Sequence, residues 1–481
     1  MKTKKITALL CALALVFCTA ASAFAAENTD WPQFLGSPAA AGLTAAQTPQ
    51  SATGAELAWS DKHTVTSEFN GMKFENNACG TPITVGNYLY LTVSDGRLLK
   101  LDTTTGKVAA TAACKNIPAY FSQIAYGDGK IYVPQQTATG VRVSAFNAEN
   151  LALIWQSDEI THGTAAQQVS SPITYYNHHV YFGTYTQDMT TYAYTSGVYA
   201  CIDTNTGKTA WQQPTDTAGY YWNGGAVVGT AIAVADSSGN ITAFGLTDGK
   251  KISSVFAGGP VSSTLCYAEG RIYASLKSGF VYSAKADTNG MIYGSSAVKS
   301  AQLGNNITSS PVVYNGRLYV AGGGYGATTP FSVLDAATLK TIYQIQGIKS
   351  QSSPLVTTAY ATDKNKHEVY IYISNYGTTD QNGSFTKDSS CVYVIRDSEG
   401  QTKASYETLF TPAIAQSSSQ SLTPSKDGML FYFNDSGTMY AIGKKAPLAS
   451  PKTGEAPAVS VMVVMAVSGA AVLLLKKKTK E

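Results

Sequence analysis

Apolar and polar residues alternate along this chain in a unit that returns about eight times between Thr81 and Lys444. Each copy opens with a small polar pair and continues with two short alternating runs separated by a turn, most clearly in SSPVVYNGRLYV from Ser309. Apolar residues at every second position predict strands with one buried face, and self-similarity at a regular spacing predicts a repeat fold. The copies begin at Thr81, Ser122, Ser170, Gly224, Ser262, Ser309, Ser352 and Ser417.

A second pair of alternating runs completes each copy and is interrupted by a turn such as T-G-K or D-G-K. YACIDTNTGKTAW from Tyr199 and ITAFGLTDGKKI from Ile241 are examples. Runs of this kind around a glycine turn are typical of hairpins, and two hairpins make a four-stranded antiparallel sheet. The spacing of the copies is close to the ~40–50 residues of propeller blades. We therefore predict an all-β, eight-bladed β-propeller over residues 55–445.

The last copy ends after MYAIGK and lacks a fourth strand. One further strand-like run, AELAW, stands before the first copy, and its Trp59 matches the tryptophans that end two other copies, Trp155 and Trp211. We predict that this N-terminal strand completes the last blade and closes the ring, which leaves only short, protected strand edges. Residues 27–54 form a lead-in to this strand.

The repeat, of the form V-Y-x-L-D-x-x-T-G-K-x-x-W, resembles the blade repeat of pyrroloquinoline quinone (PQQ) enzymes and of related non-enzymatic propellers. The sequence WPQFLGSP from Trp31 resembles the W-P-x-F-R-G-x-P lead-in of that superfamily. The resemblance covers about residues 30–444 and implies the propeller fold. For function it implies either a PQQ dehydrogenase, which holds Ca²⁺ with carboxylates and amides, or a binding scaffold without catalysis.

Both ends of the chain have the pattern of targeting segments. At the N-terminus, three lysines, an apolar run and the A-x-A sequence at Ala23–Ala25 predict a signal peptide over residues 1–26. At the C-terminus, residues 458–475 are uncharged and precede a basic tail, residues 476–481, a pattern that predicts a transmembrane segment with a cytoplasmic end. These segments predict an extracellular, surface-attached protein.

The linker, residues 446–457, resembles the cell-wall sorting signal of Gram-positive surface proteins. Its motif consists of Pro451, Lys452, Thr453 and Gly454. The resemblance implies that a sortase cuts after Thr453 and joins it to peptidoglycan, although Ser450 stands where the commonest signal has leucine. A simple stop-transfer helix is the alternative reading.

Charge and cysteine usage narrow the function further. Residues 27–454 carry 27 basic and 29 acidic residues, so no basic excess supports nucleic-acid binding. The cysteines are scattered without a C-x-x-C or adjacent pair, which argues against a zinc or redox site, and Cys201 and Cys266 read as small buried residues. His178 and His179 fall at a hairpin turn, so we expect no metal there.

The segments before the first strands are expected to ring the mouth of the central channel, on the same face as the long loops between second and third strands. Their residues are polar and almost uncharged, which argues against a Ca²⁺ site and hence against PQQ. The exception is aromatic: Tyr220, Tyr221 and Trp222, followed by Asn223, replace the usual Ser-Ser pair. Flat rings beside amides suit a sugar or a quinone-like plane, unless these rings pack between blades. The candidate ligand-binding residues are Tyr220, Tyr221, Trp222, Asn223, Gln168, Gln351 and Gln416.

These observations predict a cell-surface, non-enzymatic propeller that binds a protein or glycan through its long-loop face. A PQQ-dependent dehydrogenase and a dedicated glycan-binding module are the alternatives. We expect neither a cofactor nor a metal. The recurrent Asp102, Asp203 and Asp335 are predicted to stabilise turns rather than to catalyse a reaction.

Overall fold

The computed structural model describes residues 30–63, 65–69, 72–76, 80–93, 95–114, 123–323, 329–381, 384–386 and 389–445, with backbone alone for 65–69 and 72–76. The predicted signal peptide, linker, transmembrane segment and tail lie outside these residues, as do Cys79 and the sorting motif with Thr453. In the described part of the chain, no helix has the length and apolar character needed to span a bilayer.

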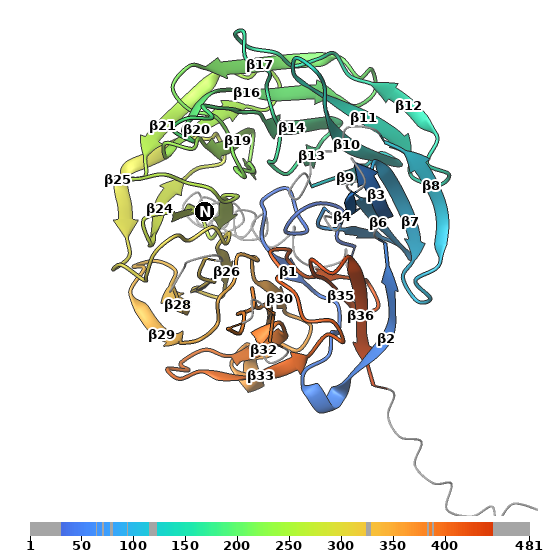
Figure 1. Cartoon of the computed structure of the whole chain (residues 1–481). Coiled ribbons are helices and arrows are strands. Elements are labelled where there is room, and N and C mark those ends of the chain that lie inside the picture. Colours follow the sequence, from blue (N-terminus) through green and yellow to red (C-terminus); the bar gives the residue numbers. More distant parts are fainter. Residues whose placement is uncertain are drawn as a thin grey trace, which may run out of the picture. The chain divides into compact units, whose positions relative to one another are not determined.

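Antiparallel sheets of four strands are the building unit, and the described chain contains eight of them. Figure 1 shows these sheets arranged as blades around a centre. Blade 1 contains β5 (Ile83–Val85), β6 (Tyr88–Val93), β7 (Arg97–Asp102) and β8 (Val108–Ala113). Blade 2 contains β9 (Ala125–Gly127), β10 (Lys130–Gln136), β11 (Val141–Asn147) and β12 (Leu153–Gln156). Blade 3 contains β13 (Thr174–Tyr176), β14 (His179–Gly183), β16 (Tyr194–Asp203) and β17 (Thr209–Thr215), with β15 (Thr186–Gln187) paired to β16.

The next blades repeat this order. Blade 4 contains β18 (Ala226–Val228), β19 (Ala231–Ala235), β20 (Asn240–Gly245) and β21 (Lys251–Phe256). Blade 5 contains β22 (Cys266–Ala268), β23 (Arg271–Leu276), β24 (Phe280–Ala286) and β25 (Ile292–Lys299). Blade 6 contains β26 (Val312–Tyr314), β27 (Arg317–Val320), β28 (Phe331–Asp335) and β29 (Thr341–Ile345).

Blades 7 and 8 include strands from the N-terminal part of the chain. Blade 7 contains β30 (Leu355–Thr357), β31 (Val369–Ser374), β32 (Val392–Asp397) and β33 (Ser405–Phe410), and β1 (Leu43–Thr44) pairs with β30 in parallel. Blade 8 contains β34 (Thr423–Pro424), β35 (Leu430–Phe433), β36 (Thr438–Lys444) and β2 (Ala55–Lys62). A separate hairpin, β3 (Val65–Phe69) and β4 (Met72–Asn76), follows β2, and two 3₁₀ turns complete the elements, η1 (Ala52–Gly54) and η2 (Asp363–Asn365).

The predicted ring closure is confirmed. Strand β2 pairs antiparallel with β36, from Ala55 opposite Lys444 to Lys62 opposite Thr438. Blade 8 therefore combines β2 from the N-terminal part of the chain with β34, β35 and β36 from the C-terminal part. The ring closes within residues 30–444, which belong to one compact unit. A closed ring has no long free edge on which another chain could add a strand.

The hydrophobic core consists of separate clusters, one at each junction between neighbouring blades of the described chain. One cluster joins Ala233 and Ala243 of blade 4 to Ile272 and Ala284 of blade 5, and another joins blade 8 to blade 1. The remaining six clusters fill the other junctions in the same way. Alternation along each strand supplies both faces of a blade, because successive side chains point to opposite sides of the sheet. The repeat pattern therefore encodes these junctions directly.

The recurrent acids and glycines of the repeat hold turns, as predicted. Asp203 Oδ1 accepts hydrogen bonds from Asn205 N at 3.0 Å and from Thr206 N at 2.8 Å, and Asp102 and Asp335 bond their own turns similarly. The glycine of the same turn, Gly207, has φ +72° and lies against the indole of Trp155 from the preceding blade. A Cβ at Gly207 would be 2.9 Å from that ring.

This tryptophan contact repeats at three junctions. The indole Nε1 of Trp155 donates to Thr204 O at 3.2 Å, Trp59 donates to Thr103 O at 2.9 Å, and Trp211 donates to Leu246 O at 3.0 Å. Each indole also covers the turn glycine of the next blade. Trp59 makes this contact from β2, so the closing strand docks on blade 1 as the other strands dock on their neighbours.

The lead-in makes one circuit of the ring on the inner strands, and the sequence did not predict this path. Its residues meet the blades in chain order, starting with the bridge from Trp31 to Thr84 of blade 1. Backbone N–H groups of the inner strands then donate to it: Tyr126 to Pro32 O, Tyr175 to Gln33 Oε1, Val227 to Pro38 O, Tyr267 to Ala39 O and Val356 to Gly42 O. The lead-in thus ties the inner strands of several blades together.

One buried ion pair joins blades 6 and 7. Asp397 of β32 is fully buried and accepts from Arg317 Nε at 2.6 Å and from Arg317 Nη2 at 2.9 Å. The hydroxyls of Tyr319 and Tyr343 donate to the same carboxylate at 2.9 and 2.8 Å. Four donors on one carboxylate satisfy it fully, which is the condition under which a buried charge is tolerated.

Candidate functional site

Long loops and pre-strand segments lie on one face of the propeller, as predicted. We call the residues just before each first strand the pre-strand segment, and this face the long-loop face. In blade 3 the pre-strand Gln168 bridges Tyr185 of the loop after β14, and in blade 7 Tyr376 N donates to Lys349 O. In blade 8 Asp435 N donates to Ser417 O at 2.9 Å. The loops that differ between blades therefore surround the end of the central channel that opens on the long-loop face.

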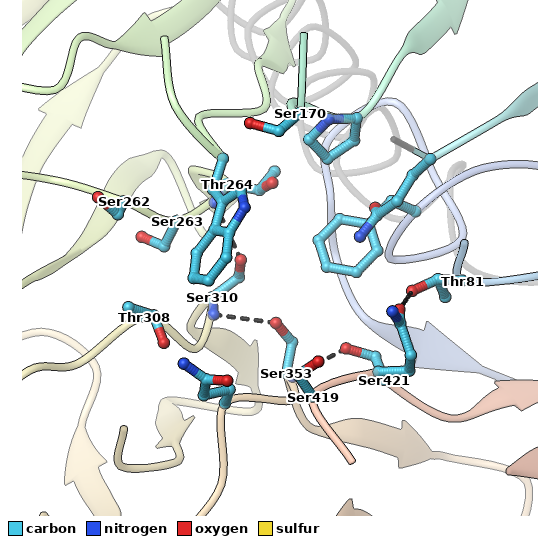
Figure 2. Close-up of a pocket in the computed structure, with 16 residues that line it drawn as sticks. Thr81, Ser170, Ser262, Ser263, Thr264, Thr308, Ser310, Ser353, Ser419 and Ser421 are labelled. Carbon is cyan, nitrogen blue, oxygen red and sulfur yellow. Dashed lines mark hydrogen bonds between the residues drawn. The ribbon is translucent and has the colours of Figure 1, made fainter. Parts of the chain in front are cut away.

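The serine pairs of the pre-strand segments hold the blades together. Some of these hydroxyls bond to the second strand of their own blade, as Ser171 Oγ does by donating to Gly183 O at 2.7 Å. Others accept a backbone N–H from the blade before them. Ser310 Oγ accepts from Thr264 N at 3.0 Å, Ser353 Oγ from Ser310 N at 2.9 Å and Ser421 Oγ from Ser353 N at 2.9 Å, a chain that Figure 2 shows in part. These hydroxyls explain the polar pair that marks each copy.

A small cavity of about 50 Å³ lies inside this ring of pre-strand residues, as Figure 2 shows. This is room for a few water molecules or for hydroxyl groups of a ligand. Among the described residues, the sixteen that line it are uncharged: Phe34, Thr81, Gln123, Ser170, Pro172, Trp222, Ser262, Ser263, Thr264, Thr308, Ser310, Gln351, Ser353, Ser419, Gln420 and Ser421. Phe34 belongs to the lead-in, so the circuit of the N-terminal segment contributes to the wall of the cavity.

Several polar atoms in this lining have no hydrogen-bond partner. Among them are the hydroxyl oxygens of Ser170, Ser262, Thr264 and Thr308 and the amide Oε1 of Gln123. Ser262 and Thr264 are 2% and 3% exposed. A buried polar group without a partner costs about 1–3 kcal/mol, so a site that holds several of them is suited to bound water or a polar ligand.

The aromatic segment separates into a core residue and a stack. Tyr220 is 5% exposed and packs on Tyr199 with ring centroids 5.3 Å apart, at the junction of blades 3 and 4. Tyr221 is stacked between two rings, with Tyr194 at 4.5 Å and Trp222 at 4.8 Å, and Tyr185 meets it edge-on. Burial raises the pKa of Tyr221 to about 12, so its hydroxyl stays protonated. Of this segment, only Trp222 lines the cavity.

The other predicted residues lie in different places. Gln351 lines the cavity together with Trp222. Asn223 is fully buried, and its Nδ2 donates to Val261 O at 3.1 Å, so it holds two blades together. Gln168 lies beside the blade 3 loop, and Gln416 precedes the cavity residues of blade 8.

Two features of the cavity do not follow the predicted arrangement. In blade 8, Ser419, Gln420 and Ser421 line the cavity where Gln416, Ser417 and Ser418 were expected, because the run of serines continues for several residues before β34 begins at Thr423. Sequence reasoning also missed Phe34, Gln123 and Gln420. The hydroxyl chain through Ser310, Ser353 and Ser421 depends on spacing between blades, which no single copy reveals.

His178, Cys201 and Cys266 lie where the sequence predicts, the histidine in a turn and the two cysteines in buried strands. Asn177 and His178 have φ +46° and +60° in the turn before β14, and His178 Nδ1 lies 2.9 Å from Asp128 Oδ2 of blade 2. Cys114, Cys201 and Cys266 are buried free thiols, and burial raises the pKa of Cys266 to about 12. In the described part of the chain, no three of the His, Cys, Asp and Glu side chains are grouped to hold a metal ion.

Comparison with known proteins agrees with this architecture. The profile of the family described as outer membrane protein assembly factor BamB matches residues 49–237 and 194–291, which together make up just over half of the chain. The chain belongs to this BamB family. A search of the curated proteins gave no match.

Solved structures share the fold of this BamB-family chain at low identity. Quinohemoprotein alcohol dehydrogenase from Comamonas testosteroni is 14% identical, with a TM-score of 0.62 over 90% of this chain and 83% of that one. BamB from Moraxella catarrhalis is 12% identical, with a TM-score of 0.53 over 82% and 99% of the two chains. A europium-containing methanol dehydrogenase is 12% identical, with a TM-score of 0.59 over 86% and 90%. Identities this low establish the fold alone, and these structures include both enzymes and an assembly factor.

Proposed function

We propose that this protein is a cell-surface, non-enzymatic propeller that binds a ligand or protein partner through its long-loop face. The observation that carries the proposal is a protruding hairpin of blade 3. Met189 and Tyr192 are 72% and 68% exposed at its tip, between β15 and β16. Asp188 Oδ1 accepts from Thr190 N at 2.7 Å and Thr191 N at 2.8 Å, so the tip is ordered. Large apolar side chains held in an ordered, exposed turn suit contact with a partner.

The chemistry of the channel mouth favours binding over catalysis. A hard cation such as Ca²⁺ takes oxygen ligands that include carboxylates. The described residues that line the cavity supply hydroxyls and amides and no carboxylate, and no cation balances an anionic quinone there. A PQQ cofactor held with Ca²⁺ does not fit these residues. Of the two kinds of relative, the assembly factor therefore offers the better analogy, and a PQQ-dependent dehydrogenase remains the alternative that the fold suggests.

The proposed location rests on the two terminal segments. Residues 1–26 have the pattern of a signal peptide, and residues 458–481 have the pattern of a membrane segment with a basic end. Sortase attachment at Thr453 would join the protein to peptidoglycan. Substitution Thr453→Ala is expected to shift the protein from the cell-wall fraction to the membrane fraction or the medium. Unchanged linkage to the wall would rule out sortase attachment at this residue.

The binding face is tested with two matched pairs of substitutions. Met189→Ser with Tyr192→Ser removes the exposed side chains of the hairpin tip. Leu153→Ser with Ile154→Ser is the control, because these residues are 54% and 47% exposed on the outer strand β12. The residue 30–444 unit, which closes its own ring, would be incubated with isolated cell-envelope fragments of the native host. We expect the first pair to reduce binding at least tenfold and the control pair to leave it unchanged. Equal binding by both variants would refute a role for this face.

A further inference from the structure

The polar groups that line the cavity at the channel mouth suit one class of ligand. The unpaired groups of the cavity include the hydroxyls of Ser170, Ser262, Thr264 and Thr308 and one amide oxygen, from Gln123. A hydroxyl can both donate and accept a hydrogen bond, and an amide oxygen accepts one. The complementary ligand therefore has several hydroxyl groups of its own. The described lining residues carry no charge, so a charged ligand would lose its hydration there without gaining a counter-charge.

Other serines beside these atoms already bond to the protein. The hydroxyls of Ser310, Ser353 and Ser421 each accept a backbone N–H from the neighbouring blade. Figure 2 shows Ser262, Thr264 and Thr308 on one side of the cavity and this bonded chain beside them. The cavity thus contains two kinds of hydroxyl with the same chemistry. One kind stabilises the ring, and the other is buried with no partner in the protein.

A rigid aromatic ring completes the site. Trp222 lines the cavity and is stacked on Tyr221, which is in turn stacked on Tyr194, with interplanar angles of 20° and 15°. Tyr185 meets both tyrosines edge-on, at 5.2 and 5.4 Å. The stack fixes the orientation of the indole before any ligand arrives, which reduces the entropy lost on binding. An aromatic ring beside uncharged hydrogen-bonding groups suits the apolar C–H face of a sugar ring.

We infer that the channel mouth binds a neutral sugar residue, which lies against Trp222 and places hydroxyl groups in the cavity. The cavity of about 50 Å³ accepts one hydroxyl-bearing edge of a sugar rather than a whole ring. Because the lead-in crosses the inner strands and contributes Phe34 to the wall, the sugar enters from the long-loop face. This inference rests on the proposed binding role of that face and assigns it a ligand class.

The test uses the residue 30–444 unit and calorimetric titration with named sugars. The probes are methyl β-D-glucopyranoside, methyl β-D-galactopyranoside and N-acetylglucosamine, with glucuronic acid as the charged comparison. We expect at least one neutral sugar to bind with a dissociation constant of about 10 mM or tighter, in the range common for weak single-site ligands. Glucuronic acid should bind at least tenfold more weakly. Failure of all three neutral sugars, or equal binding of glucuronic acid, would overturn the inference.

Two variants with opposite expectations separate the ligand site from the fold. Ser262→Ala combined with Thr264→Val removes two unpaired hydroxyls, so sugar binding should fall about tenfold or more while the unfolding temperature is unchanged or higher. Ser353→Ala removes a hydroxyl that accepts the Ser310 N–H, so the unfolding temperature should fall while sugar affinity stays within about twofold. If the double variant binds sugar as the parent does, the unpaired hydroxyls hold only water and the inference is wrong.

The envelope-binding assay distinguishes this failure from failure of the proposed function. If no sugar binds but Met189→Ser with Tyr192→Ser still abolishes envelope binding, the long-loop face binds a partner of another class. If neither sugar nor envelope fragments bind, both proposals fail together.

Discussion

Removal of the buried carboxylate of Asp397 should destabilise the propeller strongly. Asp397 is fully buried and receives four hydrogen bonds, two from Arg317 and one each from Tyr319 and Tyr343. In Asp397→Ala, the guanidinium of Arg317, itself 8% exposed, remains buried without a counter-charge. Breaking a buried ion pair from one side costs about 3–5 kcal/mol. A typical domain is stable by about 5–15 kcal/mol, so this loss is a large part of the total.

The assay is equilibrium urea unfolding of the residue 30–444 unit, followed by tryptophan fluorescence. Asp335→Ala is the control, because Asp335 accepts from its own turn, at Thr338 N and Thr338 Oγ1, and holds no buried charge. We expect the control to cost about 1 kcal/mol, the usual net value of such a bond. The double variant Arg317→Met with Asp397→Leu should recover only part of the stability, because it removes the unpaired charge but leaves the hydroxyls of Tyr319 and Tyr343 without their acceptor. A loss below about 1 kcal/mol in Asp397→Ala, or one equal to the control, would refute this reasoning.

Three further predictions follow from other contacts. Gly207→Ala should lower the free energy of unfolding in urea clearly more than Gly129→Ala does. Both glycines have φ near +70°, but only a Cβ at Gly207 would meet an indole, that of Trp155. Equal losses would mean that the tryptophan contact is not tight. Gln33→Ala should lower stability by about 1–3 kcal/mol, because it leaves the N–H of Tyr175 without its acceptor, and a loss within error would contradict the importance of the lead-in circuit. Burial raises the pKa of Asp435, so the stability that this carboxyl group contributes below the ordinary pKa of an aspartate is lost as pH rises through the folded pKa. Asp435→Asn should therefore stabilise the protein at pH 7 but not at pH 3. A stabilisation that does not depend on pH would contradict this assignment.

The regular part of the fold could be predicted from the sequence because each copy encodes its own hairpins and faces. Ring closure was also predictable, since Trp59 repeats the position of Trp155 and Trp211 and the last copy lacks a strand. The circuit of the lead-in was not predictable, because most of its contacts to the inner strands use backbone atoms and leave no side-chain pattern. Asp397 was missed because the sequence IRDSEG around it resembles a turn, whereas the structure places it in a buried network.

The site was predictable only in part. The aromatic segment stood out from the serine pairs, and Trp222 lines the cavity. Tyr220 lies in the core and Tyr221 lies inside the aromatic stack, and these positions depend on residues of blade 3 that pack beside them. In the same way, the distinction between bonded and unpaired hydroxyls depends on neighbouring blades. The repeat sequence predicts which polar groups each blade contains, but contacts with the neighbouring blades decide which of these groups have no hydrogen-bond partner.

If this BamB-family propeller binds without catalysing a reaction, as proposed, it should not form a working PQQ centre. The residue 30–444 unit would be titrated with PQQ in the presence of Ca²⁺ while the visible spectrum of the quinone and the reduction of an acceptor dye by added alcohol are recorded. We expect an unchanged spectrum and no dye reduction, because the described residues that line the cavity offer no carboxylate to the cation. A stoichiometric spectral shift with alcohol-dependent dye reduction would contradict it.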